Sequence, residues 1–118
     1  MMGHAKLQLY VCFTTCVKPL EDLQALLADH LEWIAGLEKS GSLFAAGPFR
    51  DLHETAGPPS GDGMIILRAT SAAEAEEIAR GCPFHMVGVR MFEIRPWVFN
   101  EGHFNLTISA TSGGVKIS

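Results

Sequence analysis

His30 is the residue of this sequence whose type and position could do chemistry. At about 100° of rotation per helical residue, it lies in the middle of an apolar stripe. The members of that stripe are Leu23, Leu26, Leu27, Ile34 and Leu37. The stripe predicts that the ring faces the interior, where an imidazole needs hydrogen-bond partners or water. His30 is therefore either a structural histidine of the core or one wall of a pocket in which it exchanges protons.

Other chemically capable residues carry weaker signals. Gly47 and Pro48 end a predicted strand, which makes either a plain turn or a place where a ligand approaches the backbone closely. Arg68 and Arg95 stand in apolar strands and could bind an anionic substrate, although pairing with Glu93 or another carboxylate is the simpler role.

Four side chains are of types that could together bind a metal ion: Cys12, Cys16, Cys82 and His85. The spacing disfavours such a site, because no Cys-x-x-Cys pair is present and the first two cysteines lie in and just after a strand. The sequence also has no Gly-x-Gly-x-x-Gly, P-loop or nucleophile-elbow pattern. We therefore expect no metal and no cofactor.

The elements that must position these residues follow a β-α-β-β-α-β order. Alternation predicts a strand over residues 7–13, and Pro19 and Gly41 bracket one long amphipathic helix. Further strands are expected over 42–46, 64–70 and 90–99, with a long loop over 50–63. Ser71 and Glu74 form a capping box for a second helix over 72–80. This order is typical of an α+β, ferredoxin-like antiparallel sheet.

The tail after residue 99 alternates again, and Ser112-Gly113-Gly114 is a predicted turn. We expect an added C-terminal strand or hairpin over 100–118. Two helices cover only one face of a sheet, yet apolar residues fall on both faces. We expect six to lie opposite the helices, wholly or in part: Tyr10, Cys12, Ile65, Leu67, Met91 and Trp97. The simplest cover is a second copy, which predicts a two-fold homodimer, and the tail is the competing cover.

Bulk composition narrows the class of protein. A chain of 118 residues with 47% hydrophobic and 19% charged residues predicts one globular domain over 1–118, with a core over 7–99. The formal charge of −4 argues against a nucleic-acid partner. No apolar run is long enough to span a membrane, and no signal-peptide pattern is present. Three cysteines, an odd number, fit free thiols in the cytoplasm.

Three segments together resemble the YciI-like (YCII-related) family. They are the helix with its central histidine, the 41–48 segment, and Cys82-Pro83-Phe84-His85 followed by Gly88-Val89 and Ile94-Arg95-Pro96-Trp97. The resemblance spans residues 7–99 and implies a ferredoxin-like fold in a dimeric α+β barrel. It also implies a pocket dyad made by a helix histidine and the aspartate of an Asp-Pro-Phe motif. At least one relative is a dehydrochlorinase, and most members have no assigned reaction.

The histidine of that dyad carries over to His30, but Cys82 stands where the family has its aspartate. A carboxylate would fix the imidazole tautomer and raise its basicity, and a thiol does neither well. Cys82 is either a nucleophile, if His30 lowers its pKa, or an inert buried residue. Asp51, Glu54 or Asp62 could supply a replacement carboxylate.

These observations lead to one hypothesis and two alternatives. The chain is a small enzyme in which His30 is the general acid/base and Cys82 lies nearby. Gly47, Pro48, Phe84 and His85 then bind a small metabolite, aromatic or lactone-like. The first alternative is a non-catalytic ligand-binding or protein-interaction module that lost catalysis with the aspartate. The second is a purely structural dimer with a filled core.

Overall fold

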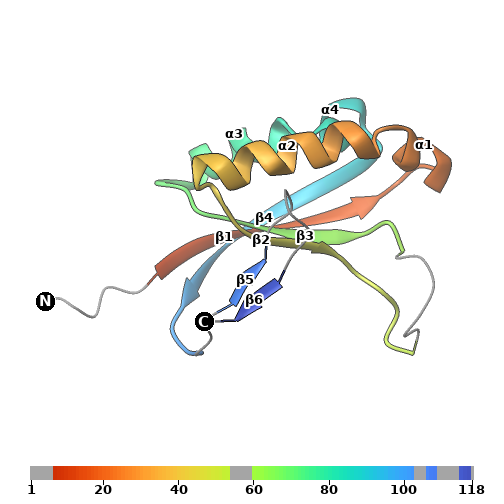
Figure 1. Cartoon of the computed structure of the whole chain (residues 1–118). Helices are drawn as coiled ribbons and strands as arrows, with labels where there is room; N and C mark the ends of the chain where they lie inside the picture. The colour runs from red at the N-terminus through yellow and green to blue at the C-terminus, as the bar shows by residue number, and fades with distance from the viewer. Residues whose placement is uncertain (1–6, 54–59, 103–105, 109–114, 118) are drawn as a thin grey trace, which may run out of the picture.

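The computed structural model describes residues 7–53, 60–102, 106–108 and 115–117. Its elements are β1 (Leu7–Cys16), α1 (Leu20–Ala25), α2 (Leu27–Ser40), β2 (Leu43–Pro48), β3 (Gly63–Leu67), α3 (Ala72–Arg80), α4 (Pro83–Val87), β4 (Arg90–Phe99), β5 (Leu106–Ile108) and β6 (Val115–Ile117). Four strands form one antiparallel sheet in the order β2-β3-β1-β4. Helices α2, α3 and α4 lie on one face of it (Figure 1). The predicted ferredoxin-like α+β fold is confirmed.

The central strand β1 sets the register from which the site is built. Thr14 lies opposite Gly63 of β3 on one side and opposite Phe92 of β4 on the other. Two residues further on, Cys16 pairs with Arg90. Since side chains alternate along a strand, the side chains of Thr14, Cys16, Arg90 and Phe92 point to one face of the sheet.

The helices cover the face of β1 opposite to the one expected from the sequence. Tyr10 and Cys12 are buried with Leu67 against Ala75 and Ala79 of α3, so the prediction that they lie away from the helices is wrong. Ile65 and Leu67 belong to the same cluster, so the prediction was wrong for them too. Alternation predicts two faces, but it does not say which one the helices cover when both are apolar. Met91 and Trp97 point to the other side, as expected.

The long helix predicted after β1 is broken at Leu26. This residue has φ −105° and ψ 3°, and its N–H bonds to the carbonyl of Leu23 at 3.1 Å, which closes α1. The Leu26 carbonyl then accepts the N–H of His30 at 2.9 Å and starts α2. As a result α1 stands at an angle beyond the end of α2 (Figure 1).

Helix α3 spans the predicted residues 72–80, because Ser71 caps its N-terminus as predicted. Ser71 Oγ accepts the N–H of Glu74 at 3.1 Å. The Glu74 carboxylate returns to Thr70, where it accepts the backbone N–H and the hydroxyl at 3.1 and 3.0 Å, and not to the Ser71 N–H as in the usual capping box. The small residues Ala75 and Ala79 let α3 lie close on the sheet.

The tail returns on itself as predicted. Strands β5 and β6 pair antiparallel in a separate two-stranded sheet, and they lie on the side of the main sheet away from the helices (Figure 1). The predicted turn at 112–114 is outside the described residues. Within the described part of the chain, no helix is both long and apolar enough to cross a membrane.

Candidate functional site

The first turn of α2 and the short helix α4 bring two aromatic rings together. The rings of His30 and Phe84 stack at 4.4 Å between centroids, with 21° between their planes. Trp33, one turn further along α2, lies 6.0 Å from the His30 ring. The imidazole is therefore held on two sides, and it is half-buried under its own helix.

Cys82 lies on the third side of the imidazole. Its Sγ atom is 3.4 Å from Nδ1 of His30, and its side chain is 0% exposed. Cys82 is the residue before α4, and Pro83 takes the first helical position, where a missing N–H costs nothing. The sequence Cys-Pro-Phe thus turns the chain so that the thiol and the Phe84 ring both meet His30.

Both members of this pair are neutral at neutral pH. The pKa of His30 is lowered to about 4, chiefly by burial and to a smaller extent by the nearby Arg90 and His85 side chains. Burial raises the pKa of Cys82 above its ordinary value, and the backbone amides of Phe84 and His85 oppose that rise only in part. A nucleophilic thiolate needs a lowered pKa, so this environment does not favour the nucleophile interpretation of Cys82.

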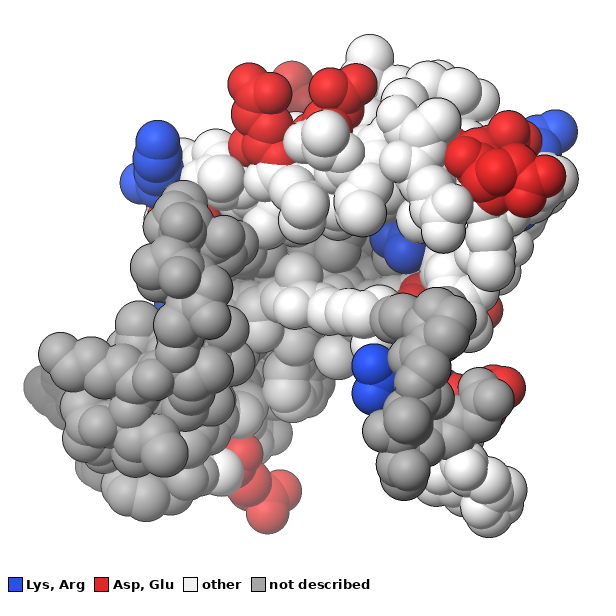
Figure 2. All heavy atoms as spheres, turned by 45° about the vertical axis from the view of Figure 1, so that its right-hand side comes forward, with Lys and Arg blue, Asp and Glu red and all other residues white. Residues whose placement is uncertain are grey.

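His30 opens onto a cavity of about 450 Å³ between the helices and the sheet. Figure 2 shows this face of the molecule hollowed below the helical layer, with acidic side chains gathered on the helices above. The predicted residues Gly47, Pro48 and Phe84 line the cavity. Most of the rest is aliphatic; the other lining residues are Thr14, Leu20, Leu23, Gln24, Leu27, Leu31, Ile34, Ala46, Gly61, Met64, Ile65 and Arg90.

His85 stands behind the cavity and is not one of its lining residues. Its Nδ1 is 2.7 Å from the carbonyl oxygen of Ala79, and its Nε2 is 3.1 Å from Thr14 Oγ1. A carbonyl only accepts, so Nδ1 carries the hydrogen and the Thr14 hydroxyl donates to Nε2. Both ring nitrogens are occupied, so His85 can act on a ligand only through Thr14.

Arg90 is a cavity residue that sequence reasoning missed. Its Nε donates to the carbonyl oxygen of Gly61 at 2.7 Å, and its guanidinium lies 4.7 Å from the centre of the Phe84 ring. One signal could have found it: Arg90 begins β4 on the same face as Phe92 and Ile94. A charged residue that starts a strand on its core face needs a partner, because burying an unpaired charge is costly.

The other sequence candidates lie elsewhere or have other partners. Arg68 donates to the Leu43 carbonyl at 3.1 Å and is exposed, and Arg95 lies on the open face of the sheet. Asp62 accepts the Cys16 N–H at 2.7 Å. Asp51 is exposed, and Glu54 is outside the described residues. The described residues contain no group of three or more His, Cys, Asp or Glu side chains that could hold a metal ion.

Comparison with known proteins adds a family model and a solved structure. A model of the YCII-related domain matches residues 8–98. Among solved structures, the chain is similar to 5-chloro-2-hydroxyhydroquinone dehydrochlorinase (TftG) from Burkholderia phenoliruptrix AC1100 in complex with 2,5-dihydroxybenzoquinone. The TM-score is 0.62 at 17% identity, over 75% of this chain and 92% of that one, so the likeness is one of fold. No curated protein matches the sequence.

Proposed function

The chain belongs to the YCII-related domain family, and on that premise we propose that it acts on a small organic molecule bound in the cavity below α1 and α2. His30 is the proton-transfer group of this proposal, with Cys82 beside it. The cavity volume of about 450 Å³ lies within the usual range for small-molecule sites.

The free nitrogen of His30 carries the proposal. Nδ1 faces Cys82, whereas Nε2 has no hydrogen-bond partner among the described residues. His30 lines the cavity, and no buried side-chain nitrogen of the described residues lacks a partner, so we infer that Nε2 is accessible from the cavity. An imidazole that lines a cavity with one nitrogen held and the other free has the arrangement of a general acid/base.

A non-catalytic ligand-binding module is the second candidate, and the thiol at position 82 is what favours it. A carboxylate would accept a hydrogen from Nδ1 and leave Nε2 as the base, but a thiol can either donate or accept. The tautomer of His30 is therefore not fixed by Cys82, and a pKa of about 4 makes the imidazole a weak base.

A turnover screen separates the two candidates. The solved neighbour is a dehydrochlorinase complexed with 2,5-dihydroxybenzoquinone, so chlorinated hydroquinones join lactones and enolisable acids in the screen. We expect His30→Gln to lower any turnover found by at least about a hundredfold, which is a typical contribution of a general acid/base. Gln24→Ala, also at the cavity wall, is the matched control for a change of lining without loss of a titrating group. Unchanged turnover in His30→Gln would remove His30 from the chemistry.

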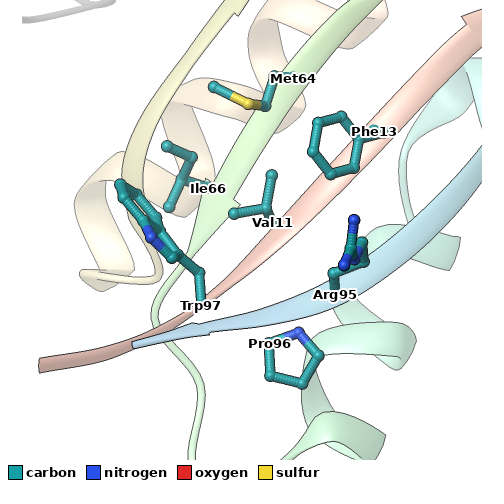
Figure 3. Close-up of a pocket in the computed structure, with 7 residues that line it drawn as sticks. All are labelled: Val11, Phe13, Met64, Ile66, Arg95, Pro96 and Trp97. Atoms are coloured by element: carbon teal, nitrogen blue, oxygen red, sulfur yellow. The ribbon is translucent and has the colours of Figure 1, made fainter. Parts of the chain in front are cut away.

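We also propose that a second copy of the chain covers the open face of the sheet. That face has a hollow of about 370 Å³, seen in Figure 3 and lined by Val11, Phe13, Met64, Ile66, Arg95, Pro96 and Trp97. Apolar surface of this kind is usually buried in an interface. The β5–β6 hairpin, which lies on the same side in Figure 1, is the competing cover.

The mass of the protein in solution tests the assembly. We expect light scattering after size exclusion to give twice the chain mass. Phe13→Glu, which places a charge in the hollow, should halve it, and Met86→Glu on the exposed surface of α4 should not. A monomeric wild-type chain would mean that the tail, and not a second copy, covers this face.

The proposed function also includes a single domain, a cytoplasmic location and no nucleic-acid partner.

A further inference from the structure

Arg90 is nine-tenths buried and yet lines the cavity of His30. Its residue exposure is 9%, and the sheet register points it to the helix-covered face, diagonally across from Thr14. Burying a guanidinium is costly unless its charge and its N–H groups are satisfied. The N–H groups of Arg90 that the protein leaves without a partner therefore indicate which groups a ligand in the cavity must offer.

The protein satisfies only part of this side chain. Nε donates to Gly61, and the flat guanidinium face rests on Phe84. No aspartate or glutamate of the described residues lies within ion-pair distance of Arg90. Asp62 acts on it only from a distance and is already bonded to the Cys16 N–H. The Nη groups of Arg90 make no hydrogen bond to a described residue. No buried side-chain nitrogen of the described residues lacks a partner, so we infer that the Nη groups open onto the cavity that Arg90 lines.

Among the described residues that line the cavity, Arg90 is the one with a formal charge. The lining residues include no aspartate, glutamate or lysine within the described chain, and His30 is neutral at neutral pH. An apolar chamber with one cation at its floor attracts a ligand of opposite charge, and the low dielectric strengthens that attraction.

We propose that the cavity takes a small carboxylate with an apolar body, whose two oxygens accept from the Nη groups of Arg90. Because Nε is held by Gly61, the approach from the Nε side is blocked and the carboxylate binds end-on to the two Nη groups. The body of the ligand then lies against the aliphatic wall, beside the His30 ring. This inference rests on the proposed function, since it names the class of molecule that the same cavity binds.

Binding of benzoate and of benzamide tests the charge requirement. The two probes are close in shape, and only benzoate carries the anion. We expect benzoate to shift the backbone NMR signals of His30, Phe84 and Arg90 and to bind at least about tenfold more tightly than benzamide. Acetate and phenylacetate extend the series in apolar size, and phenol at high pH tests a phenolate in place of a carboxylate.

Variants assign the effect to one side chain. Arg90→Gln should lower benzoate affinity by about tenfold to a hundredfold and leave benzamide unchanged. Arg90→Lys keeps the charge but loses the paired Nη geometry, so it should retain part of the affinity. Arg80→Gln, an exposed arginine of α3, is the matched control and should bind benzoate like the wild type.

Each outcome decides the proposal. Equal binding of benzoate and benzamide in the cavity would overturn the carboxylate subsite and leave the small-molecule cavity standing. Failure of every carboxylate to bind at millimolar concentration would overturn it as well. Tighter binding of phenolate than of benzoate would replace the carboxylate with another oxyanion. The role of His30 is judged separately by turnover, so failure of the carboxylate subsite can be told apart from failure of the proposed function.

Discussion

The thiol sulfur of Cys82 lies 3.4 Å from Nδ1 of His30, although the two residues are 52 positions apart in the chain. The contact joins the start of α4 to the first turn of α2 across the top of the sheet. A thiol at this place gives the imidazole a neutral neighbour that can donate or accept. The thiol therefore leaves the tautomer of His30 open, whereas a charged side chain at position 82 would also change the pKa of His30.

Replacing the thiol with a carboxylate should raise the pKa of His30. In Cys82→Asp, the negative charge beside Nδ1 favours the imidazolium, and an opposite charge at this distance shifts a pKa by about one to three units. We expect the value to rise from about 4 toward or beyond the ordinary 6.5. NMR titration of the histidine ring signals measures it directly.

Cys82→Ser is the control for that experiment, because a hydroxyl is small and polar but carries no charge. The pKa of His30 should then stay close to its wild-type value. An equally large rise in both variants would mean that polarity or water entry, and not the carboxylate charge, sets the pKa.

The low pKa of His30 predicts a loss of stability on acidification. The ordinary pKa of 6.5 applies to the unfolded chain, and the folded value is about 4. Between these values the unfolded state binds more protons, so the free energy of unfolding falls as pH drops from 6.5 toward 4. Above pH 6.5 the ring is neutral in both states and contributes nothing.

The magnitude is at most about 3 kcal/mol, and screening by solvent reduces it because the ring is only half-buried. Urea unfolding at pH 7.5 and 5.0 measures the part of this loss that falls above pH 5.0. His85 changes in the same direction, so the wild-type loss includes both rings. His30→Gln should therefore lose less stability than the wild type over this range. An identical loss in both proteins would show that His30 does not titrate as described.

Much of the fold follows from local sequence patterns. Helix α3 and strand β4 have their predicted bounds, because a capping serine, a terminal glycine and strict alternation are signals that neighbours along the chain supply. The break at Leu26 has no such signal, since neither proline nor glycine stands there. Which face of β1 is covered is also decided by tertiary packing, and that is why Tyr10 and Cys12 were misplaced.

In the candidate site, too, local sequence signals predicted some residues and tertiary packing decided the others. His30 was found because a polar ring interrupts an apolar stripe, and its nearness to Cys82 followed from the family resemblance. Arg90 and Thr14 were missed, because each looks ordinary within its own strand. Only the pairing of β1 with β4, a contact between distant segments, places them side by side under the cavity.

Gly63 of β3 should tolerate no side chain, whereas Gly47 of the adjacent strand β2 should tolerate one. A Cβ at Gly63 would stand 2.8 Å from the carbonyl oxygen of Gly47, so the backbone of β2 or β3 would have to move. We expect Gly63→Ala to cost about 1–3 kcal/mol of unfolding free energy, as overpacking does. Gly47→Ala meets nothing within 4 Å and is the matched control in thermal or urea unfolding. Equal losses in the two variants would contradict the close approach.

Thr14 should matter to stability through His85 and to ligand binding through the cavity. Its hydroxyl donates to His85 Nε2 at 3.1 Å, while His85 Nδ1–H binds the carbonyl of Ala79 at the end of α3. Thr14→Val keeps the shape but leaves Nε2 without its donor in a nearly closed space. We expect a loss of about 1–3 kcal/mol in unfolding free energy, which is the cost of an unsatisfied buried polar group.

Thr14→Ser keeps the hydroxyl and removes only a methyl group, so it should recover most of that loss. The ring signals of His85 report the same bond: they should stay close to their wild-type positions in Thr14→Ser, and the Nε2 signal should move in Thr14→Val, where the donor is absent. Wild-type stability in Thr14→Val would mean that water already satisfies His85. In that case β1 would be tied to the α3–α4 junction by packing alone, and Thr14 would be free to turn its hydroxyl toward a ligand.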